Sequence, residues 1–106
     1  MPTFMIKASY SAEGTRGLMK DGGTGRRDAI EALITSRGGT LKSFYYAFGD
    51  DDLYIIAELP SNADLVAVSL AINASGGAKV KSNTLLDAAE IDDAVQKAVR
   101  YRPPGT

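Results

Sequence analysis

The chain has 106 residues, of which 44% are hydrophobic and 24% charged, a composition typical of a folded globular domain. Its 12 basic and 13 acidic residues leave a net charge of −1, so it lacks the cationic excess of a sequence-independent nucleic-acid binder. It has no cysteine and no histidine, which excludes disulfides, iron–sulfur clusters, thiol nucleophiles and the commonest zinc ligand. We therefore expect one domain over residues 1–106, with no cofactor and no nucleic-acid partner.

No segment of the sequence has the pattern of a membrane span or a leader. The longest apolar stretch inside an expected element, residues 65–72, is too short to cross a bilayer. Residues 1–10 contain one lysine and no leader-like apolar run. These features predict a cytoplasmic protein without a membrane partner.

The first third of the chain predicts a strand, an interrupted region and a helix. Residues 3–10 alternate as a strand does, whereas residues 11–21 give a mixed signal with at most a short helical turn. Three glycines at positions 22–25 are expected to interrupt any helix. Thr24 is the expected N-cap of a stronger helix that ends near Arg37, before two glycines.

A hairpin and a second helix are expected next. Residues 40–48 are rich in aromatic side chains, and residues 53–59 form the following strand. The short connection 49–52 makes these two strands a hairpin. Ser61, followed three residues later by Asp64, is the N-terminal signature of a helix that runs to a glycine pair.

The last elements complete a known arrangement. Residues 78–86 predict a fourth strand, and Asp87 with Glu90 caps a last helix that continues to residue 102, before two prolines. The order β-α-β-β-α-β is the ferredoxin-like, split βαβ arrangement, here with an extra C-terminal helix. We therefore expect an α+β fold with a four-stranded antiparallel sheet.

Both faces of this sheet are apolar by simple alternation. In residues 40–48 alternation predicts Phe44, Tyr46 and Phe48 on one face, opposite Leu41, Ser43, Tyr45 and Ala47. The third strand likewise places Tyr54, Ile56 and Glu58 opposite its clearest apolar set. Since a sheet face in water is usually polar, a second subunit is the simplest cover, and we expect at least a homodimer in solution.

The residues from Gly39 to Thr84 resemble the GYD-domain proteins, small bacterial proteins placed among the dimeric α/β-barrel folds. The matching features are Gly38-Gly39, Gly49 and Asp52 at the hairpin, Glu58-Leu59-Pro60, Thr84, the early Glu13-Gly14 and the Arg26-Arg27 pair. The family's name-giving tyrosine corresponds to Asp51 in this chain. The resemblance implies a dimeric α/β barrel and no particular chemistry.

Two polar segments have both a functional and a structural interpretation. Residues 50–52 are three aspartates that resemble ligands for a hard cation, but their spacing is that of a hairpin turn, so we expect no metal site. Residues 22–27 are rich in glycine and arginine. They are either a connection with solvated arginines or an anion site in which Arg26 contacts a ligand.

The clearest candidate site lies on the central strands, on the face opposite the main apolar stripe. It consists of Lys7, Tyr54 and Glu58 as candidate catalytic residues, with Tyr45 and Ser9 as candidate ligand-binding residues. A carboxylate enclosed by apolar groups has a raised pKa and can serve as a general base without histidine. The alternative is that Lys7 and Glu58 pair across the strands and fix the register at a dimer interface.

Thr84 is a further candidate ligand-binding residue, with sheet-end hydrogen bonding as its alternative role. Two functions follow from these residues. The first is a small-molecule-binding protein, or a cofactor-independent enzyme, that acts on a hydrophobic or aromatic compound in a sheet-lined cavity. The second is a non-catalytic module that oligomerises through its open sheet face. The analogy with other dimeric α/β-barrel proteins, which include cofactor-free monooxygenases and small-molecule sensors, operates at the level of the fold.

Overall fold

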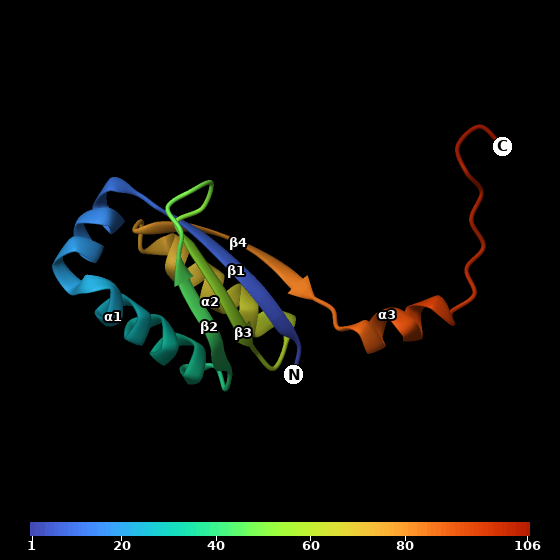
Figure 1. Ribbon diagram of the computed structural model, residues 1–106, viewed down its shortest axis with the longest axis horizontal. Helices are drawn as coiled ribbons and strands as arrows, with labels where there is room; N and C mark the ends of the chain where they lie inside the picture. Colours follow the sequence, from blue (N-terminus) through green and yellow to red (C-terminus); the bar gives the residue numbers. More distant parts are fainter.

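The computed structural model describes residues 1–106 and contains one four-stranded antiparallel sheet (Figure 1). In chain order the elements are β1 (Thr3–Tyr10), α1 (Ala12–Ser36), β2 (Thr40–Tyr46), β3 (Leu53–Glu58), α2 (Asn62–Ala74), β4 (Ala78–Leu85) and α3 (Ala88–Val95). The strand order is β2-β3-β1-β4. The predicted α+β, ferredoxin-like arrangement with an additional C-terminal helix is therefore confirmed. None of the helices is both long enough and apolar enough to span a membrane.

Helices α1 and α2 cover one face of the sheet, and the core lies between them and the strands. The core has 11 buried hydrophobic residues, and the largest fully buried ones are Phe4, Ile6, Ile34, Ile55, Leu59 and Val68. Each such side chain contributes about 1.5–3 kcal/mol by leaving water. The other side of the sheet is the open face. It carries residues that include Met5, Lys7, Tyr45, Tyr54 and Ile56.

The face assignment predicted for β2 is wrong in one respect. The pairing of β2 with β3 shifts register between Leu41 and Ser43, so Lys42 is an extra residue in a β-bulge. Leu41 therefore lies opposite Ala57, on the helix-covered side together with Phe44. The bulge removes one apolar residue from the open face, which is less apolar than alternation predicts.

The region before the glycine cluster is a helix rather than a short turn. Helix α1 begins after its N-cap Ser11, not after Thr24, and the only non-helical residue inside it is Gly22, at φ 77° and ψ 166°. A positive φ is unfavourable for residues with a Cβ atom, so Gly22 is the hinge that separates two helical segments. The prediction that glycine interrupts the helix is thus confirmed, at a single residue.

The first segment of α1 sits directly against the loop before β4. The backbone N–H of Ser11 donates to the Gly77 carbonyl at 3.0 Å, and its hydroxyl donates to the Gly76 carbonyl at 2.7 Å. A Cβ atom on Gly14 would lie 1.8 Å from the Gly77 carbonyl oxygen. This close approach holds the start of α1 beside the end of α2.

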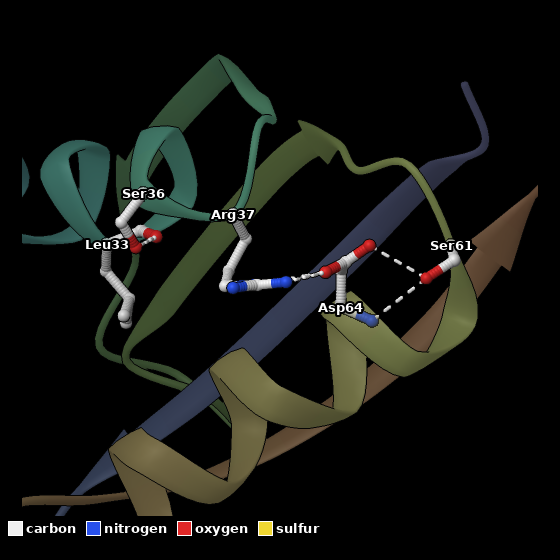
Figure 2. Close-up of polar contacts among 5 residues, drawn as sticks. All are labelled: Leu33, Ser36, Arg37, Ser61 and Asp64. Carbon is white, nitrogen blue, oxygen red and sulfur yellow. Dashed lines mark hydrogen bonds and ion pairs between the residues drawn. The ribbon is translucent and has the colours of Figure 1, made fainter.

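The opposite ends of the two helices are joined by an ion pair (Figure 2). Arg37, the C-cap residue of α1, donates from Nε and Nη2 to Oδ1 of Asp64 at 3.0 and 2.8 Å. The other Asp64 oxygen accepts from the hydroxyl of Ser61, the N-cap residue of α2. The Ser61 hydrogen bond, followed by that from Arg37, lowers the pKa of Asp64 below its usual value. The two helices are therefore fixed relative to each other at both ends.

Helix α3 and the residues after it extend away from the sheet (Figure 1). The predicted capping box of Asp87 and Glu90 is present, but the helix ends at Val95 rather than near residue 102. No residue of α3 is buried, and a short helix without packing has little to stabilise its last turns. The radius of gyration is 17.0 Å, whereas a compact domain of this size has about 13 Å.

Candidate functional site

An apolar cavity of about 170 Å³ lies between α1, α2 and the sheet. Its lining comprises Ile6, Ala8, Tyr10, Arg26, Ala29, Ile30, Leu33, Leu53, Ile55, Ala71, Ile72, Ser75, Ala78 and Val80, of which 12 are hydrophobic. The floor is the helix-facing side of β1, β3 and β4, and the two walls come from α1 and α2. The cavity is therefore sheet-lined, but it lies on the side opposite the open face.

Arg26 is the one charged residue in this lining. It precedes Ile30 by four residues and Leu33 by seven, so the helical repeat places it on the inner stripe of α1. Its guanidinium Nη1 donates to Asp21 at 3.4 Å, a long contact that engages one of five N–H donors. Arg27 lies instead beside the surface acids Asp28 and Glu31, at 3.6 and 3.5 Å.

Tyr10 adds a hydroxyl group to the same part of the cavity. Burial, reinforced by the neighbouring Tyr46, raises the pKa of Tyr10 to about 12. At neutral pH its hydroxyl is therefore uncharged and is able to donate a hydrogen bond. The Tyr46 hydroxyl donates to the Gly23 carbonyl at 2.9 Å, which ties β2 to α1 just beyond its hinge.

A polar groove of about 260 Å³ adjoins the cavity. The two share Tyr10, Arg26 and Ser75, and the groove also contains Glu13 and Asp21. The shared residues thus form a polar boundary between an apolar interior and an outer polar surface. This arrangement suits a ligand with an apolar body and a polar head.

The open face brings together only part of the candidate set predicted from the sequence. Tyr54 lies opposite Tyr45 on one side and Lys7 on the other, and Lys7 lies opposite Lys81. These four side chains form one row across the sheet. Tyr45 is 69% exposed, and none of the row lines a cavity. A ligand role for Lys7, Tyr54 and Tyr45 stays a prediction.

Glu58 does not belong to this row, and its predicted pairing with Lys7 is wrong. It lies opposite Thr3 on β1, four residues from Lys7 and therefore about 13 Å away along the strand. Its carboxylate instead pairs with Lys42, the bulge residue, at 3.2 Å. The Lys42 side chain is 52% exposed, so the substitution Glu58→Gln would leave no buried lysine without a partner.

Ser9 serves the hairpin turn between β2 and β3. Its hydroxyl donates to Oδ1 of Asp51 at 3.2 Å, and the Lys81 ammonium lies 3.1 Å from the same oxygen. Asp51 is only 4% exposed, and Asp52 accepts a hydrogen bond from the backbone N–H of Tyr10 at 2.8 Å. The aspartates thus attach the turn to β1 and β4, and no group of three or more potential metal ligands gathers there.

This arrangement predicts a specific loss of stability in acid. The Lys81 hydrogen bond, followed by that from Ser9, lowers the pKa of Asp51. A lowered native pKa contributes stability above the unfolded value, and that stability is lost as the pH falls below about 4 and through the native pKa. In urea unfolding between pH 7 and pH 2, we expect Asp51→Asn to lower the stability at pH 7 and to flatten the acid decline.

Asp50→Asn is the matched control, since no hydrogen bond or ion pair involves that side chain. It should retain the wild-type pH profile. An Asp51→Asn profile as steep as that of the wild type would contradict the assigned contacts.

Thr84 and Tyr10 both lie on the helix-facing side of the sheet. Thr84 lies opposite Phe4, on the helix-facing side of β4, and lines no cavity. Tyr10 was not identified from the sequence as a site residue. It continues the Phe4–Ile6–Ala8 set of β1, so its hydroxyl on the core-facing side of a strand is the sequence signal that could have identified it.

Of two comparisons with known proteins, one gives a match. No curated protein matches the chain. A family model, described as the GYD domain, matches residues 4–95 of the 106. The match includes all four strands except the first residue of β1, the two helices that wall the cavity, and α3. The chain therefore belongs to the GYD-domain family.

Proposed function

We propose that this protein binds a small compound with an apolar body and an anionic head in the cavity between α1 and α2. The observation that carries the proposal is one arginine, Arg26, at the edge of a cavity in which 12 of the 14 lining residues are hydrophobic. An apolar cavity within a small core lowers stability, so a ligand that fills it gains packing contacts that the protein itself lacks.

The size of the cavity selects a small ligand. Drug-sized ligands occupy about 300–1,000 Å³, whereas an apolar cavity of about 150 Å³ accommodates one benzene ring. At about 170 Å³, this cavity fits a single six-membered ring or a short branched chain. The polar head then lies at the boundary with the groove, beside Tyr10, Arg26 and Ser75.

The lining favours binding over acid–base catalysis. Tyr10 and Arg26 are its only ionisable residues. A guanidinium stays protonated in proteins, and the pKa of about 12 keeps Tyr10 neutral. Neither is a general base near neutral pH, and both are hydrogen-bond donors for a carboxylate or similar anion.

Benzoate is a suitable probe, because it combines one ring with one carboxylate. We expect saturable binding of benzoate by calorimetry, with a Kd of about 1 mM or tighter, and weaker binding of toluene. Replacing Arg26 with Met should weaken benzoate binding by about tenfold or more, since a charge-assisted hydrogen bond contributes about 1.5–3 kcal/mol. Toluene binding should be unchanged, because the apolar part of the cavity is intact.

Arg27→Met is the control for this experiment. It removes the same charge from the adjacent residue, whose side chain faces surface acids rather than the cavity. Equal losses of benzoate affinity in the Arg26 and Arg27 variants would show that net charge, and not the cavity boundary, determines binding.

A second candidate function rests on a different observation, the unpacked C-terminal helix. Its exposed apolar side chains favour a role in self-association. The two functions are compatible, because the cavity and the open face lie on opposite sides of the sheet.

A further inference from the structure

The residues after β4 form a C-terminal arm, defined here as residues 86–101, whose apolar side chains have no partner within the chain. Ile91 is 49% exposed, and Val95, one helical turn later, is 73% exposed. Leu86, Val99 and Tyr101 are also exposed. Since i and i+4 residues share one face of a helix, Ile91 and Val95 form an apolar stripe that faces solvent.

The first part of the arm is acidic, and the basic residues Lys97 and Arg100 follow it. Residues 86–96 contain four acidic residues and no basic one, namely Asp87, Glu90, Asp92 and Asp93. Glu90 and Asp92 flank the apolar stripe, whereas Asp93 lies on the far side of the helix, 4.0 Å from Lys97. A partner surface for this helix needs apolar groups at its centre and cations at its side.

The open face has this combination of groups. Met5, Tyr54 and Ile56 lie at its centre, on neighbouring strands. Lys7, Lys79 and Lys81 lie toward β4, where Asp51 is the one carboxylate in contact with them. The arm and the β4 side of the open face thus carry opposite net charge and have matching apolar centres.

We infer that the C-terminal arm of one copy of this chain covers the open face of a second copy, and that the exchange is reciprocal. Each copy has one arm and one open face, so a twofold dimer satisfies both surfaces at once. The apolar stripe packs on the tyrosine side of the face, and the acidic residues lie beside the lysines. This role for the arm does not depend on the ligand proposed above.

A charge exchange tests the inference on the full chain. Asp92→Lys and Lys7→Glu/Lys79→Glu should each raise the dimer dissociation constant at least about tenfold in sedimentation velocity. An equimolar mixture of the two variants should form a heterodimer, because each arm then meets a face of opposite charge. Wild-type chains that remain monomers at high micromolar concentration, or a mixture that fails to associate, would overturn the inference.

Because the chain has no native cysteine, engineered thiols locate the contact. A mixture of Val95→Cys and Tyr54→Cys chains should give a disulfide-linked dimer of mixed composition under mild oxidation. A mixture of Val95→Cys and Asp28→Cys should not, since Asp28 lies on the outer side of α1. In a chain that carries both Val95→Cys and Tyr54→Cys, an intrachain disulfide with no linked dimer would show that the arm folds onto its own sheet and would also overturn the inference.

Discussion

Replacing Gly14 with alanine is expected to destabilise the protein by about 3 kcal/mol, the upper part of the range for overpacked sites. The added Cβ atom would lie 1.8 Å from the Gly77 carbonyl oxygen and 2.7 Å from the Gly77 carbonyl carbon, and these backbone atoms cannot turn aside as a flexible side chain can. The start of α1 must then move away from the loop before β4. Urea unfolding followed by circular dichroism measures the change in the free energy of unfolding.

Gly17→Ala is the control, because it lies in the same helical segment and its Cβ atom would meet nothing within 4 Å. Alanine there should stabilise the helix by about 0.5–1 kcal/mol. The two substitutions therefore have opposite expected signs. A Gly14→Ala variant as stable as the wild type would contradict the close approach of α1 to Gly77.

Replacing Ile30 with alanine should both destabilise the fold and enlarge the cavity. Ile30 is buried in the core and forms part of the cavity wall. Truncating a buried isoleucine costs about 2–5 kcal/mol, because packing contacts are lost and the space is not refilled. The ratio of the affinity for 2-naphthoate, a two-ring probe, to the affinity for benzoate should therefore be higher in the variant than in the wild type.

Val66→Ala is the control for this experiment, since Val66 is an exposed apolar residue on α2 and does not line the cavity. It should change the free energy of unfolding by less than about 0.5 kcal/mol. The ratio of the affinities for 2-naphthoate and benzoate should stay that of the wild type. An Ile30→Ala variant with reduced stability and an unchanged ratio would place the ligand outside the cavity.

The fold was predictable from local patterns because most strands and caps follow ordinary rules. Strand alternation identified β1 and β3, and the polar caps Ser61 and Asp87 identified the starts of α2 and α3. The bulge at Lys42 was not predictable, because nothing in the local composition marks one extra residue in a strand. The first segment of α1 was missed because Gly14 and Gly17 weaken the local helix signal, and the contact of its N-cap with Gly77 is not visible in the sequence.

The site was harder to predict because a cavity depends on how two helices are spaced. Ala29 and Ala71 are small residues on opposite walls, and their joint effect follows only from the packing of α1 against α2. The inward position of Arg26 was recoverable from the sequence, since it lies four residues before Ile30. The predicted pairing of Lys7 with Glu58 is wrong because alternation fixes only the face on which each residue lies. The register of β1 with β3 places Glu58 four residues from Tyr54, the residue opposite Lys7.

The most direct test of the cavity as a ligand site is a titration of the ¹⁵N-labelled protein with benzoate, followed by two-dimensional NMR. The proposal predicts saturable shifts of the backbone amides of cavity residues such as Ile30, Ile72 and Val80. The amides of Tyr45 and Tyr54 on the open face should shift little. Saturable shifts confined to the open face, or no saturable shifts at millimolar benzoate, would contradict the account.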